Sequence, residues 1–335
     1  MQKIAFLFLF VATSLVAQQS DFKDISFTKA DYIAKKTKSK RLYDLNKLTF
    51  KLTQNLETDV EKVRAIYVWI CNNIANDFRL YSMNERKRNK YVKDSIALQN
   101  WNSKFKNLLF KKLLRKKRTI CTGYAYLFKE MCALADIKAI IINGFGRTAT
   151  VDFEKLVMPN HTWNAVLLNN KWYLCDPTWS TGISFPEEGK FTFQYSDGYF
   201  LTEPKLFFLN HFPLEKQHSL LGENTPNFQE FTEMPLLYAD AFQFVSEHIA
   251  PLKMYNEIQI DSIITFQYHL KKEVDLPKIK FVLNGGGNDF VQTPKTTITN
   301  NLLTLEHLFS KKGFFDVHLY IEEKLIATYV YKVAK

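Results

Sequence analysis

A cysteine, a histidine and an aspartate occur in this chain in an order that suits nucleophilic catalysis at an amide. Cys121 opens the run "CTGYAYLFKEMC", whose apolar residues recur at helical spacing, and His161 and Asp176 follow in two short apolar segments. A thiolate can attack a carbonyl carbon, an imidazole can move a proton, and a carboxylate can orient the imidazole. Whether these three side chains meet depends on the elements that carry them.

The histidine and the aspartate belong to a predicted β-hairpin. "HTWNAVLL" and "KWYLCDPTW" read as strands, and Asn169-Asn170 between them suits a two-residue turn with positive φ angles. Trp163 then lies opposite Asp176, and His161 projects from the same face as the diagonal neighbour of Asp176. A three-residue loop would send Asp176 to the opposite face. In the two-residue register Asp176 accepts from one ring nitrogen and leaves the other as a base.

The position of Cys121 at the start of a helix favours its thiolate. The positive end of the helix dipole, the free backbone N–H groups of the first turn and a nearby imidazolium all stabilise negative charge on sulfur. Gly123 leaves room at this turn for another strand or a substrate chain. The oxyanion of an acyl group on Cys121 would bind the Cys121 N–H and one further donor.

The first 17 residues, "MQKIAFLFLFVATSLVA", have the pattern of a secretory signal peptide. Lys3 precedes an apolar run that ends at the small residue Ala17. A membrane anchor is the alternative, but the run is shorter than the roughly 20 apolar residues that a spanning helix needs. We therefore expect an exported protein, periplasmic or extracellular. The formal charge of +11 favours acidic partners, while export makes nucleic acid an improbable one.

Cysteine usage leaves a second interpretation open. Four cysteines in an oxidising compartment allow two disulfides: Cys71, Cys121, Cys132 and Cys175. If Cys121 is a free nucleophile, at least one of the other three is also unpaired or pairs with another chain. We expect Cys132 in the core and Cys175 on the strand face opposite to the site. No CxxC pair and no cluster with ligand spacing is present, so we expect no metal and no cofactor.

The chain is long enough for two domains, and its patterns predict an α+β domain followed by a β domain. Residues 18–222 contain a helix starting near Asp59, the helix at Cys121 and a largely antiparallel sheet. Residues 223–259 read as a connector. Residues 260–335 give short alternating strands, the pattern of a small β-sandwich of immunoglobulin-like (Ig-like) type.

A strongly basic insertion at about 84–118 interrupts the first domain. Its later part, 104–118, places Phe105, Leu108, Leu109 and Leu113 on one side of a helix and lysines on the other. A solvated helical face is the simpler interpretation. Contact with an anionic wall polymer or membrane surface is the alternative.

Several motifs in order resemble one family. "KVRAIYVWICNNIANDF", "CTGYAYLFKEMC" and "HTWNAVLLNNKWYLCDPTW" resemble the transglutaminase-like superfamily of cysteine enzymes, and most of all its kyphoscoliosis-peptidase-type group. The later "YFLTEPKLFFLNHFPLEKQHSLLG" is similar to the segment that follows the core in that group, with His218-Ser219 where the group has a Trp before its final Leu-Leu. The resemblance covers about residues 45–222.

The resemblance implies a papain-like core with Cys121 as nucleophile, His161 as general base and Asp176 as orienting acid. It also implies acyl transfer from a peptide or glutamine amide to water or to an amine. In the family, a Trp N–H upstream of the nucleophile can complete the oxyanion hole. Trp101 is the only Trp between Trp69 and Cys121, so it takes this place here.

Aromatic residues and other polar residues surround the three candidate residues in the sequence. Trp163 and Trp179 are expected as walls of the site, whereas Asp77, His211 and His218 are expected to be structural. The substrate class is a peptide, a protein or a cell-wall polymer. A non-catalytic binding or scaffold protein that keeps the same fold is the alternative to an exported cysteine enzyme.

Overall fold

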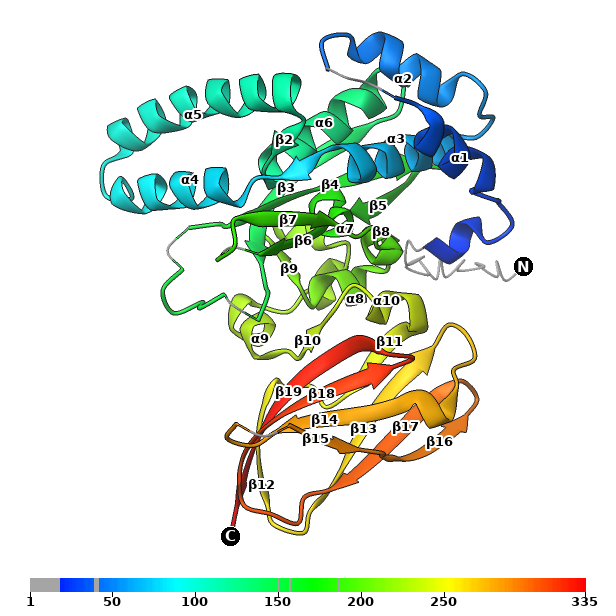
Figure 1. Cartoon of the computed structure of the whole chain (residues 1–335), viewed down its shortest axis with the longest axis vertical. Helices are drawn as coiled ribbons and strands as arrows, with labels where there is room; N and C mark the ends of the chain where they lie inside the picture. The colour runs from blue at the N-terminus through cyan, green and yellow to red at the C-terminus, as the bar shows by residue number, and fades with distance from the viewer. Residues whose placement is uncertain (1–18, 39–41, 150, 157, 186, 288) are drawn as a thin grey trace, which may run out of the picture.

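The computed structural model describes residues 19–38, 42–149, 151–156, 158–185, 187–287 and 289–335. The predicted signal peptide, residues 1–17, lies outside the described residues. Figure 1 shows helices and a central sheet in the first part of the chain and two further sheets near the C-terminus. The predicted mixed α+β class with C-terminal antiparallel strands is confirmed.

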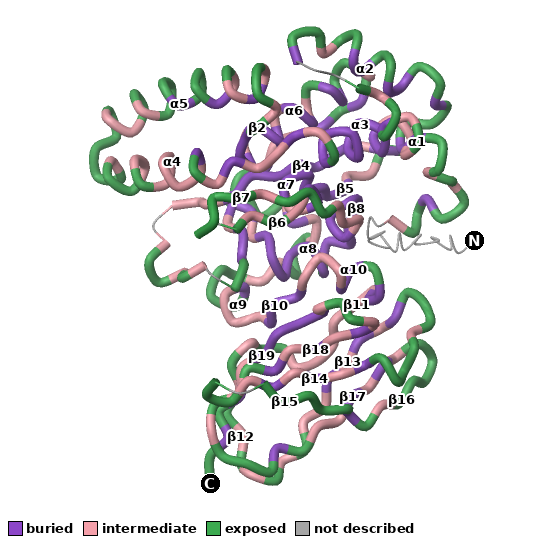
Figure 2. Tube along the Cα trace, viewed as in Figure 1, coloured by how far each residue is buried: buried purple, intermediate pink, exposed green. Residues whose placement is uncertain are grey.

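Helix α3 (Asp59–Asn73) is the central helix of the first part. Its start is fixed by a capping box, in which Thr58 and Glu61 satisfy each other's backbone N–H groups. The helix is buried from Val60 to Cys71 almost without interruption and packs on α1 (Thr28–Lys36), α2 (Leu45–Thr53) and α6 (Cys121–Ala133). In Figure 2, α3 lies in the part of the trace that is coloured mainly as buried.

A five-stranded antiparallel sheet packs on these helices in the order β8-β5-β4-β3-β9. The predicted hairpin register is confirmed, because Leu168 pairs with Lys171 and Asn164 with Cys175. Asn169 and Asn170 form the turn with φ angles of 48° and 61°. The strands are β3 (Ala139–Gly146), β4 (His161–Leu168), β5 (Lys171–Cys175), β8 (Phe200–Thr202) and β9 (His211–Pro213).

Short elements surround this sheet. The helices are α7 (Pro177–Thr181), α8 (Pro204–Phe208), α9 (Phe228–Glu233) and α10 (Ala241–Phe244), and the strands are β1 (Ala75–Asn76), β2 (Arg118–Thr119), β6 (Gly182–Phe185) and β7 (Lys190–Phe193).

The basic insertion is a helical hairpin made of α4 (Phe78–Lys90) and α5 (Ser95–Lys116), which projects from the rest of the molecule (Figure 1). Phe105, Leu109 and Leu113 are buried, as predicted. Leu108 is 42% exposed, so its predicted place on the buried side is wrong. The buried residues follow a strict four-residue spacing, which leaves Leu108 on the solvent side of the helix.

The C-terminal part consists of two sheets with one shared core. One sheet has the order β11-β13-β17-β16, and the other has the order β10-β19-β18-β14-β15 with β12 beside β19. Phe266 and Phe281 meet between them with ring centroids 4.8 Å apart. The strands are β10 (Leu236–Leu237), β11 (Val245–Ala250), β12 (Tyr255–Gln259), β13 (Ile263–Leu270), β14 (Ile279–Asn284), β15 (Asp289–Gln292), β16 (Lys295–Thr299), β17 (Leu302–Leu308), β18 (Gly313–Ile321) and β19 (Lys324–Ala334).

The expected connector 223–259 contains strands of these sheets. Its strand β11 pairs with β13, and β12 pairs with β19 in parallel. The sheets therefore include residues before 260, where we expected their first strand. Pairing with strands far along the chain stabilises these segments, and local alternation of residue types does not report it.

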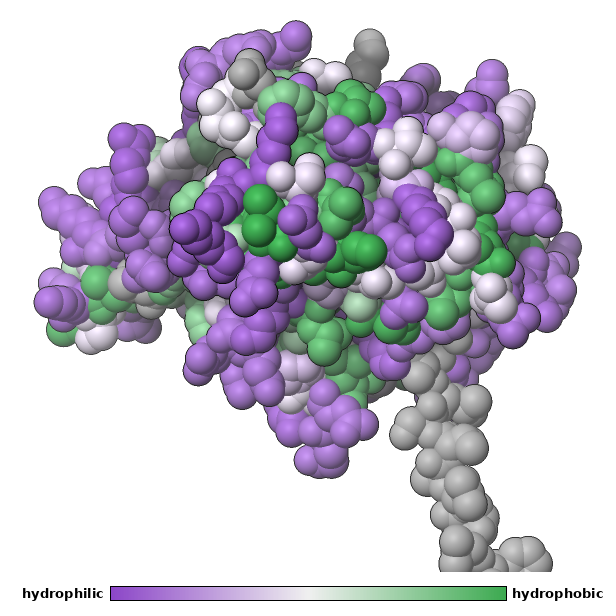
Figure 3. All heavy atoms as spheres, turned by 90° about the horizontal axis from the view of Figure 1, so that it is seen from below, coloured by the Kyte–Doolittle hydropathy of each residue, from purple (hydrophilic) through white to green (hydrophobic). Residues whose placement is uncertain are grey.

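No helix within the described ranges has the length and apolar character that a membrane crossing requires. Figure 3, seen from below, shows hydrophilic side chains around smaller groups of hydrophobic ones. The helical hairpin, at the left in this view as in Figure 1, presents mainly hydrophilic residues.

Candidate active site

Cys121 is the first residue of α6 and is 7% exposed. Its N-cap residue, Ile120, is extended and offers no side-chain cap, so a first-turn N–H is not taken by a cap. A Cβ at Gly123 would lie 1.8 Å from Thr119 Oγ1. The room expected at Gly123 is therefore filled by strand β2, and this contact seats the start of α6 against it.

His161 and Asp176 meet as the hairpin register predicted. His161 Nε2 lies 2.6 Å from Asp176 Oδ2, and both side chains are buried. With Nε2 bound to the carboxylate, Nδ1 is the nitrogen left for the Cys121 side chain, which lies near enough to the ring to contribute to its raised pKa. The structure thus brings the three predicted residues together in the order Cys121, His161, Asp176.

Asp176 is held as a carboxylate by four donors. It is the N-cap of α7, where its Oδ1 accepts from the backbone N–H groups of Thr178 at 2.8 Å and Trp179 at 3.3 Å. Pro177 at the first helical position has the φ angle that this helix start requires. Oδ2 accepts from His161 and from His211 Nε2 at 3.1 Å. The two oxygens therefore have their acceptor capacity filled.

The electrostatics of the pair favour an imidazolium. Burial alone would lower the pKa of His161, but the charge and hydrogen bond of Asp176, together with the interaction with the Cys121 side chain, raise it to about 10. Burial would raise the pKa of Asp176, but His161 and then His211 hold it well below its usual range. At neutral pH the site carries a cationic ring beside the thiol and an anion behind the ring.

Both tryptophans expected as walls lie against His161. The Trp179 ring stacks on the imidazole with centroids 4.8 Å apart, and the Trp163 ring does so at 5.9 Å. Strand β3 can pass close to this stack because it has Gly146 there: an added Cβ would lie 2.9 Å from His161 Cβ and 3.0 Å from Trp179 Cζ2.

Trp101 is not placed as the expected oxyanion donor. Its indole Nε1–H donates to Asn84 Oδ1 at 2.9 Å, between α5 and α4, and its ring stacks on Phe105. The donor is thus engaged inside the helical hairpin. The expected role is not realised in the structure because the insertion folds on itself, and this folding gives the Trp101 N–H an acceptor within the hairpin.

His211 is a site residue that the sequence analysis assigned to a structural role. It is buried at the start of β9, pairs with Gly146 of β3, and points Nε2 at Asp176. Burial lowers the pKa of His211 to about 4, and the hydrogen bond to Asp176 offsets only part of that fall. The sequence offered only the "NHFP" motif in the segment after the core, and nothing local in that segment predicts that it pairs near Asp176.

Asp77 and His218, the other residues expected to be structural, do not contact Cys121, His161 or Asp176 through any hydrogen bond or ion pair of the described residues. Asp77 caps α4 through Leu80 N–H and pairs with Lys112 and Arg118, and His218 lies near Glu215. These contacts fix the base of the helical hairpin and a short turn.

The four cysteines are unpaired and buried, so the disulfide alternative is not realised in the structure. Burial raises the pKa of Cys71 and Cys132 well above the usual range and that of Cys175 to about 12. These three thiols pack in the core among the helices and the sheet. Cys121 differs from them in its contact with His161.

The site contains donor atoms of the type that bind divalent metals, which the sequence analysis did not expect. One ligand atom each from His161, Asp176 and His211 lies within 4.8 Å of the others. Ligands of a tetrahedral zinc ion, at about 2.0–2.1 Å from the metal, lie roughly 3.3 Å apart. The 2.6 Å contact between His161 and Asp176 is shorter than that spacing and fits a direct hydrogen bond between the two side chains.

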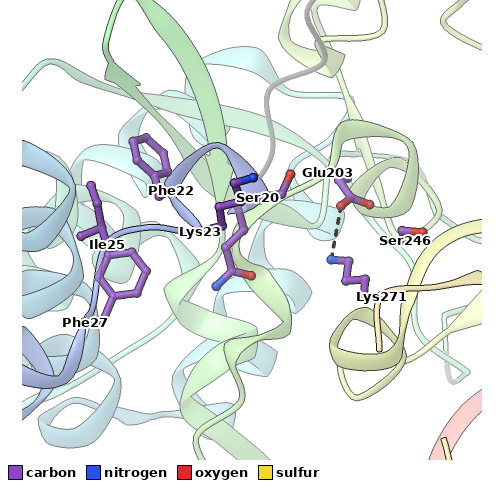
Figure 4. A pocket seen from close by; sticks show the side chains of 9 residues that line it. Ser20, Phe22, Lys23, Ile25, Phe27, Glu203, Ser246 and Lys271 are labelled. Carbon is purple, nitrogen blue, oxygen red and sulfur yellow. Dashed lines mark ion pairs between the residues drawn. The ribbon is translucent and has the colours of Figure 1, made fainter. Parts of the chain in front are cut away.

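Two hollows of different size accompany the fold. The larger, about 510 Å³, is lined by Phe22, Phe27, Glu203 and Lys271 among others, and Figure 4 shows the Glu203–Lys271 ion pair at its edge. Its lining includes none of the site residues. The smaller, about 20 Å³, is lined by Tyr81 of α4 and by Asn160, the neighbour of His161. The smaller hollow is therefore adjacent to the candidate active site, whereas the larger one does not contain any of its residues.

The chain resembles known proteins over the region that holds these residues. Residues 46–177 match the family model described as "Transglutaminase-like superfamily". Human kyphoscoliosis peptidase is 34% identical over 203 residues, which cover 58% of this chain and 27% of that protein. Hillarin of Drosophila melanogaster is 24% identical over 234 residues, covering 66% of this chain and 26% of its own.

This chain spans about a quarter of the length of the curated relatives that it matches. Among solved structures, one titled "Crystal structure of a TGase" is similar with a TM-score of 0.27 and 16% identity, covering 52% of this chain and 37% of that one. That score is too low to indicate a shared overall fold.

Proposed function

Because residues 46–177 belong to the transglutaminase-like superfamily and are distantly homologous to kyphoscoliosis peptidase, we propose that the chain is a cysteine enzyme that transfers acyl groups from peptide or glutamine amides. The observation that carries the proposal is the double engagement of His161. One ring nitrogen binds the buried Asp176 carboxylate, and the Cys121 side chain is close enough to the same ring to help raise its pKa. This arrangement converts a thiol into a nucleophile.

In the first half-reaction, the Cys121 thiolate attacks the carbonyl carbon of the amide. The C–N bond then breaks, the His161 imidazolium gives its proton to the leaving amine, and a thioester on Cys121 remains. In the second half-reaction, water or a second amine attacks the thioester carbon and His161 takes its proton. The Cys121 sulfur leaves with its electron pair, and the starting ion pair is restored. Asp176 keeps the imidazole in one orientation throughout.

The backbone at the start of α6 contributes to the oxyanion hole. The Cys121 N–H belongs to the first helical turn, where donors are not consumed by the helix itself. A donor here is worth on the order of 3 kcal/mol of transition-state stabilisation in known acyl-transfer enzymes. With the Trp101 N–H bound to Asn84, the second donor comes from another group.

The test is mass spectrometry of the full chain after incubation with a glutamine-containing peptide library and a labelled primary amine. We expect cleaved or amine-labelled peptides and a thioester on Cys121. Cys121→Ala should abolish the products. Cys132→Ala removes another buried thiol on the same helix and should retain them.

The alternative, a scaffold without catalysis, predicts a different result from the same samples. Wild type and Cys121→Ala would both give unmodified peptides, and native Cys121 would react with iodoacetamide no faster than denatured cysteine. Hydrolysed peptides without amine label would identify a peptidase, and labelled ones an amine acyltransferase.

We also propose export of the protein to the periplasm or the extracellular space, supported by the signal-like sequence of residues 1–17. Contact with an anionic polymer or surface is supported by the helical hairpin. Its later part carries exposed cations that form no ion pair with other described residues: Lys104, Lys106, Lys111, Arg115 and Lys116. Replacing three of them by Glu should lower retention on an anionic resin without changing the reaction of Cys121.

An Ig-like classification of the C-terminal sheets is supported by their strand order. If β11, β13, β14 and β16–β19 correspond to strands A to G, β11-β13-β17-β16 is an ABED sheet and β19-β18-β14 is the GFC sheet. We propose this domain as an accessory module, because the three proposed catalytic residues, Cys121, His161 and Asp176, all lie in residues 46–177.

A further inference from the structure

We propose that His211 is a positioning residue, which donates a hydrogen bond to Asp176 and thereby holds the carboxylate in the geometry that His161 needs. The inference rests on the proposed function, because it assigns a role within the same site. His211 does not contact the thiol in the structure. Its effect on Cys121 passes through Asp176 and His161.

The geometry places both histidines on the same oxygen. His161 Nε2 and His211 Nε2 lie 2.6 Å and 3.1 Å from Asp176 Oδ2, while the two ring centroids are 5.3 Å apart. The other oxygen is fixed by backbone N–H groups of α7. Without His211, the carboxylate could rotate about its N-cap bonds toward or away from His161. With it, Oδ2 is held from two directions.

The surroundings of His211 make it a donor without a charge. Its ring stacks on Phe207 with centroids 3.9 Å apart and lies 4.3 Å from Trp179 and 5.0 Å from Trp163. An apolar enclosure of this kind disfavours an imidazolium. A neutral ring orients Asp176 without neutralising it, so the negative charge of Asp176 remains available to His161.

The tautomer follows from the two acceptors that face the ring. Nε2 points at the Asp176 carboxylate at 3.1 Å, and Nδ1 lies 3.3 Å from the Phe207 carbonyl oxygen. A neutral imidazole has one N–H, and a bond to a charged acceptor is the stronger of the two. The proton is therefore on Nε2, directed at Asp176.

Two substitutions distinguish the hydrogen-bond donor of His211 from the packing of its ring. His211→Phe keeps an aromatic ring between Phe207 and Trp179 but has no donor. His211→Gln keeps an N–H donor near the Nε2 position but has no ring. We expect the rate constant for iodoacetamide modification of Cys121 at neutral pH to fall on the order of tenfold in His211→Phe, since the Asp176 carboxylate loses one of the two donors at Oδ2. His211→Gln should recover most of that loss.

A structural role for His211 predicts the reverse order, because the ring and not the donor fills the space. If His211→Phe reacts at the wild-type rate, or His211→Gln is the slower variant, the inference is wrong. Thermal unfolding of both variants identifies rate changes that follow stability alone.

A measurement on the unaltered chain covers the case in which both variants fail to fold. Long-range proton–nitrogen NMR of the histidine rings at pH 7 should show His211 as the neutral Nε2–H tautomer, and an Nδ1–H tautomer would overturn the assignment. If instead wild-type Cys121 reacts no faster than denatured cysteine, the proposed function fails whatever the tautomer of His211. If wild-type Cys121 reacts rapidly and Cys121 in His211→Phe reacts at the same rate, this inference is wrong while the proposed function stands.

Discussion

Each part of the molecule contains a histidine whose ring hydrogen-bonds with a side-chain oxygen, and the pKa values of these two histidines shift in opposite directions. In the first part His161 binds the Asp176 carboxylate, and in the C-terminal sheets His248 Nε2 lies 3.0 Å from the Tyr329 hydroxyl. The pKa of His161 is raised to about 10, whereas burial lowers that of His248 to about 4. The comparison indicates that burial favours the neutral form of a histidine, and that the Asp176 carboxylate outweighs burial at His161, although it does not do so at the more enclosed His211.

The difference also separates a site from a packing contact. The His248 ring lies against Tyr268 and Tyr329, and the Tyr329 hydroxyl continues to that of Tyr268. This group has hydrogen bonds and aromatic contacts similar to those of His161 but contains no carboxylate and no thiol. Aromatic enclosure is common to both histidines, so the anion of Asp176 and the thiol of Cys121 are the features that carry chemistry.

The largest effect is expected when the anion is removed by Asp176→Asn. The amide can still cap α7 through its oxygen, but its NH₂ group then faces the nitrogens of His161 and His211. His161 must turn its Nε2 lone pair to that amide, which puts a proton on the side of Cys121 and removes the base. We expect the rate of Cys121 alkylation at pH 7 to fall on the order of a hundredfold.

Asp152→Asn is the matched control for this change, since Asp152 is an exposed carboxylate paired with Lys155. It should leave the alkylation rate unchanged. If Asp176→Asn folds and its Cys121 is alkylated at the wild-type rate, the carboxylate does not distinguish His161 from His248 and the comparison is wrong.

The next effect concerns stability at alkaline pH. Because the pKa of folded His161 lies near 10 and that of an unfolded histidine near 6.5, its stabilising contribution is complete below pH 6.5 and is lost as pH rises to about 10. The free energy of unfolding of wild type, relative to His161→Gln, should therefore fall by a few kcal/mol between pH 6 and pH 10. Urea unfolding of both proteins at the two pH values measures it. A difference that is constant with pH would contradict the cationic state of His161.

A smaller effect of opposite sign is expected at His248. Its pKa near 4 in the folded state means that the unfolded chain binds a proton first as the pH falls below 6.5, which destabilises the fold. His248→Gln cannot titrate but keeps a donor for Tyr329. Urea unfolding at pH 7 and pH 5 should show that wild type loses about 1–2 kcal/mol more than the variant. Equal losses would mean that His248 titrates as if it were exposed.

The parts of the site that local sequence determines were predictable. The turn at Asn169-Asn170 fixes the hairpin register, and the register places His161 beside Asp176. The start of α6 at Cys121 was predictable because helical spacing and a preceding extended segment are both local. In these cases the relevant neighbours lie within one hairpin or one helix.

The parts that depend on distant pairing were not predictable. His211 reaches Asp176 because β9 adds to the edge of β3, a contact between residues far apart in the chain. The same holds for β11 and β12, which join sheets built mostly from later strands. Trp101 failed for a related reason, since the two helices of the insertion satisfy its N–H themselves. Local periodicity does not specify which sheet edge or helix accepts a segment.

The central claim, that a carboxylate-supported imidazolium activates Cys121, is tested most directly by alkylation of the full chain at pH 6. Intact-protein and peptide mass spectrometry would follow iodoacetamide modification of Cys121 in native wild type, native His161→Gln and denatured wild type. The account predicts that native wild-type Cys121 reacts at least tenfold faster than in the other two samples, since a free thiol near pKa 8.5 is less than about 1% ionised at this pH. Equal rates in all three samples would contradict it.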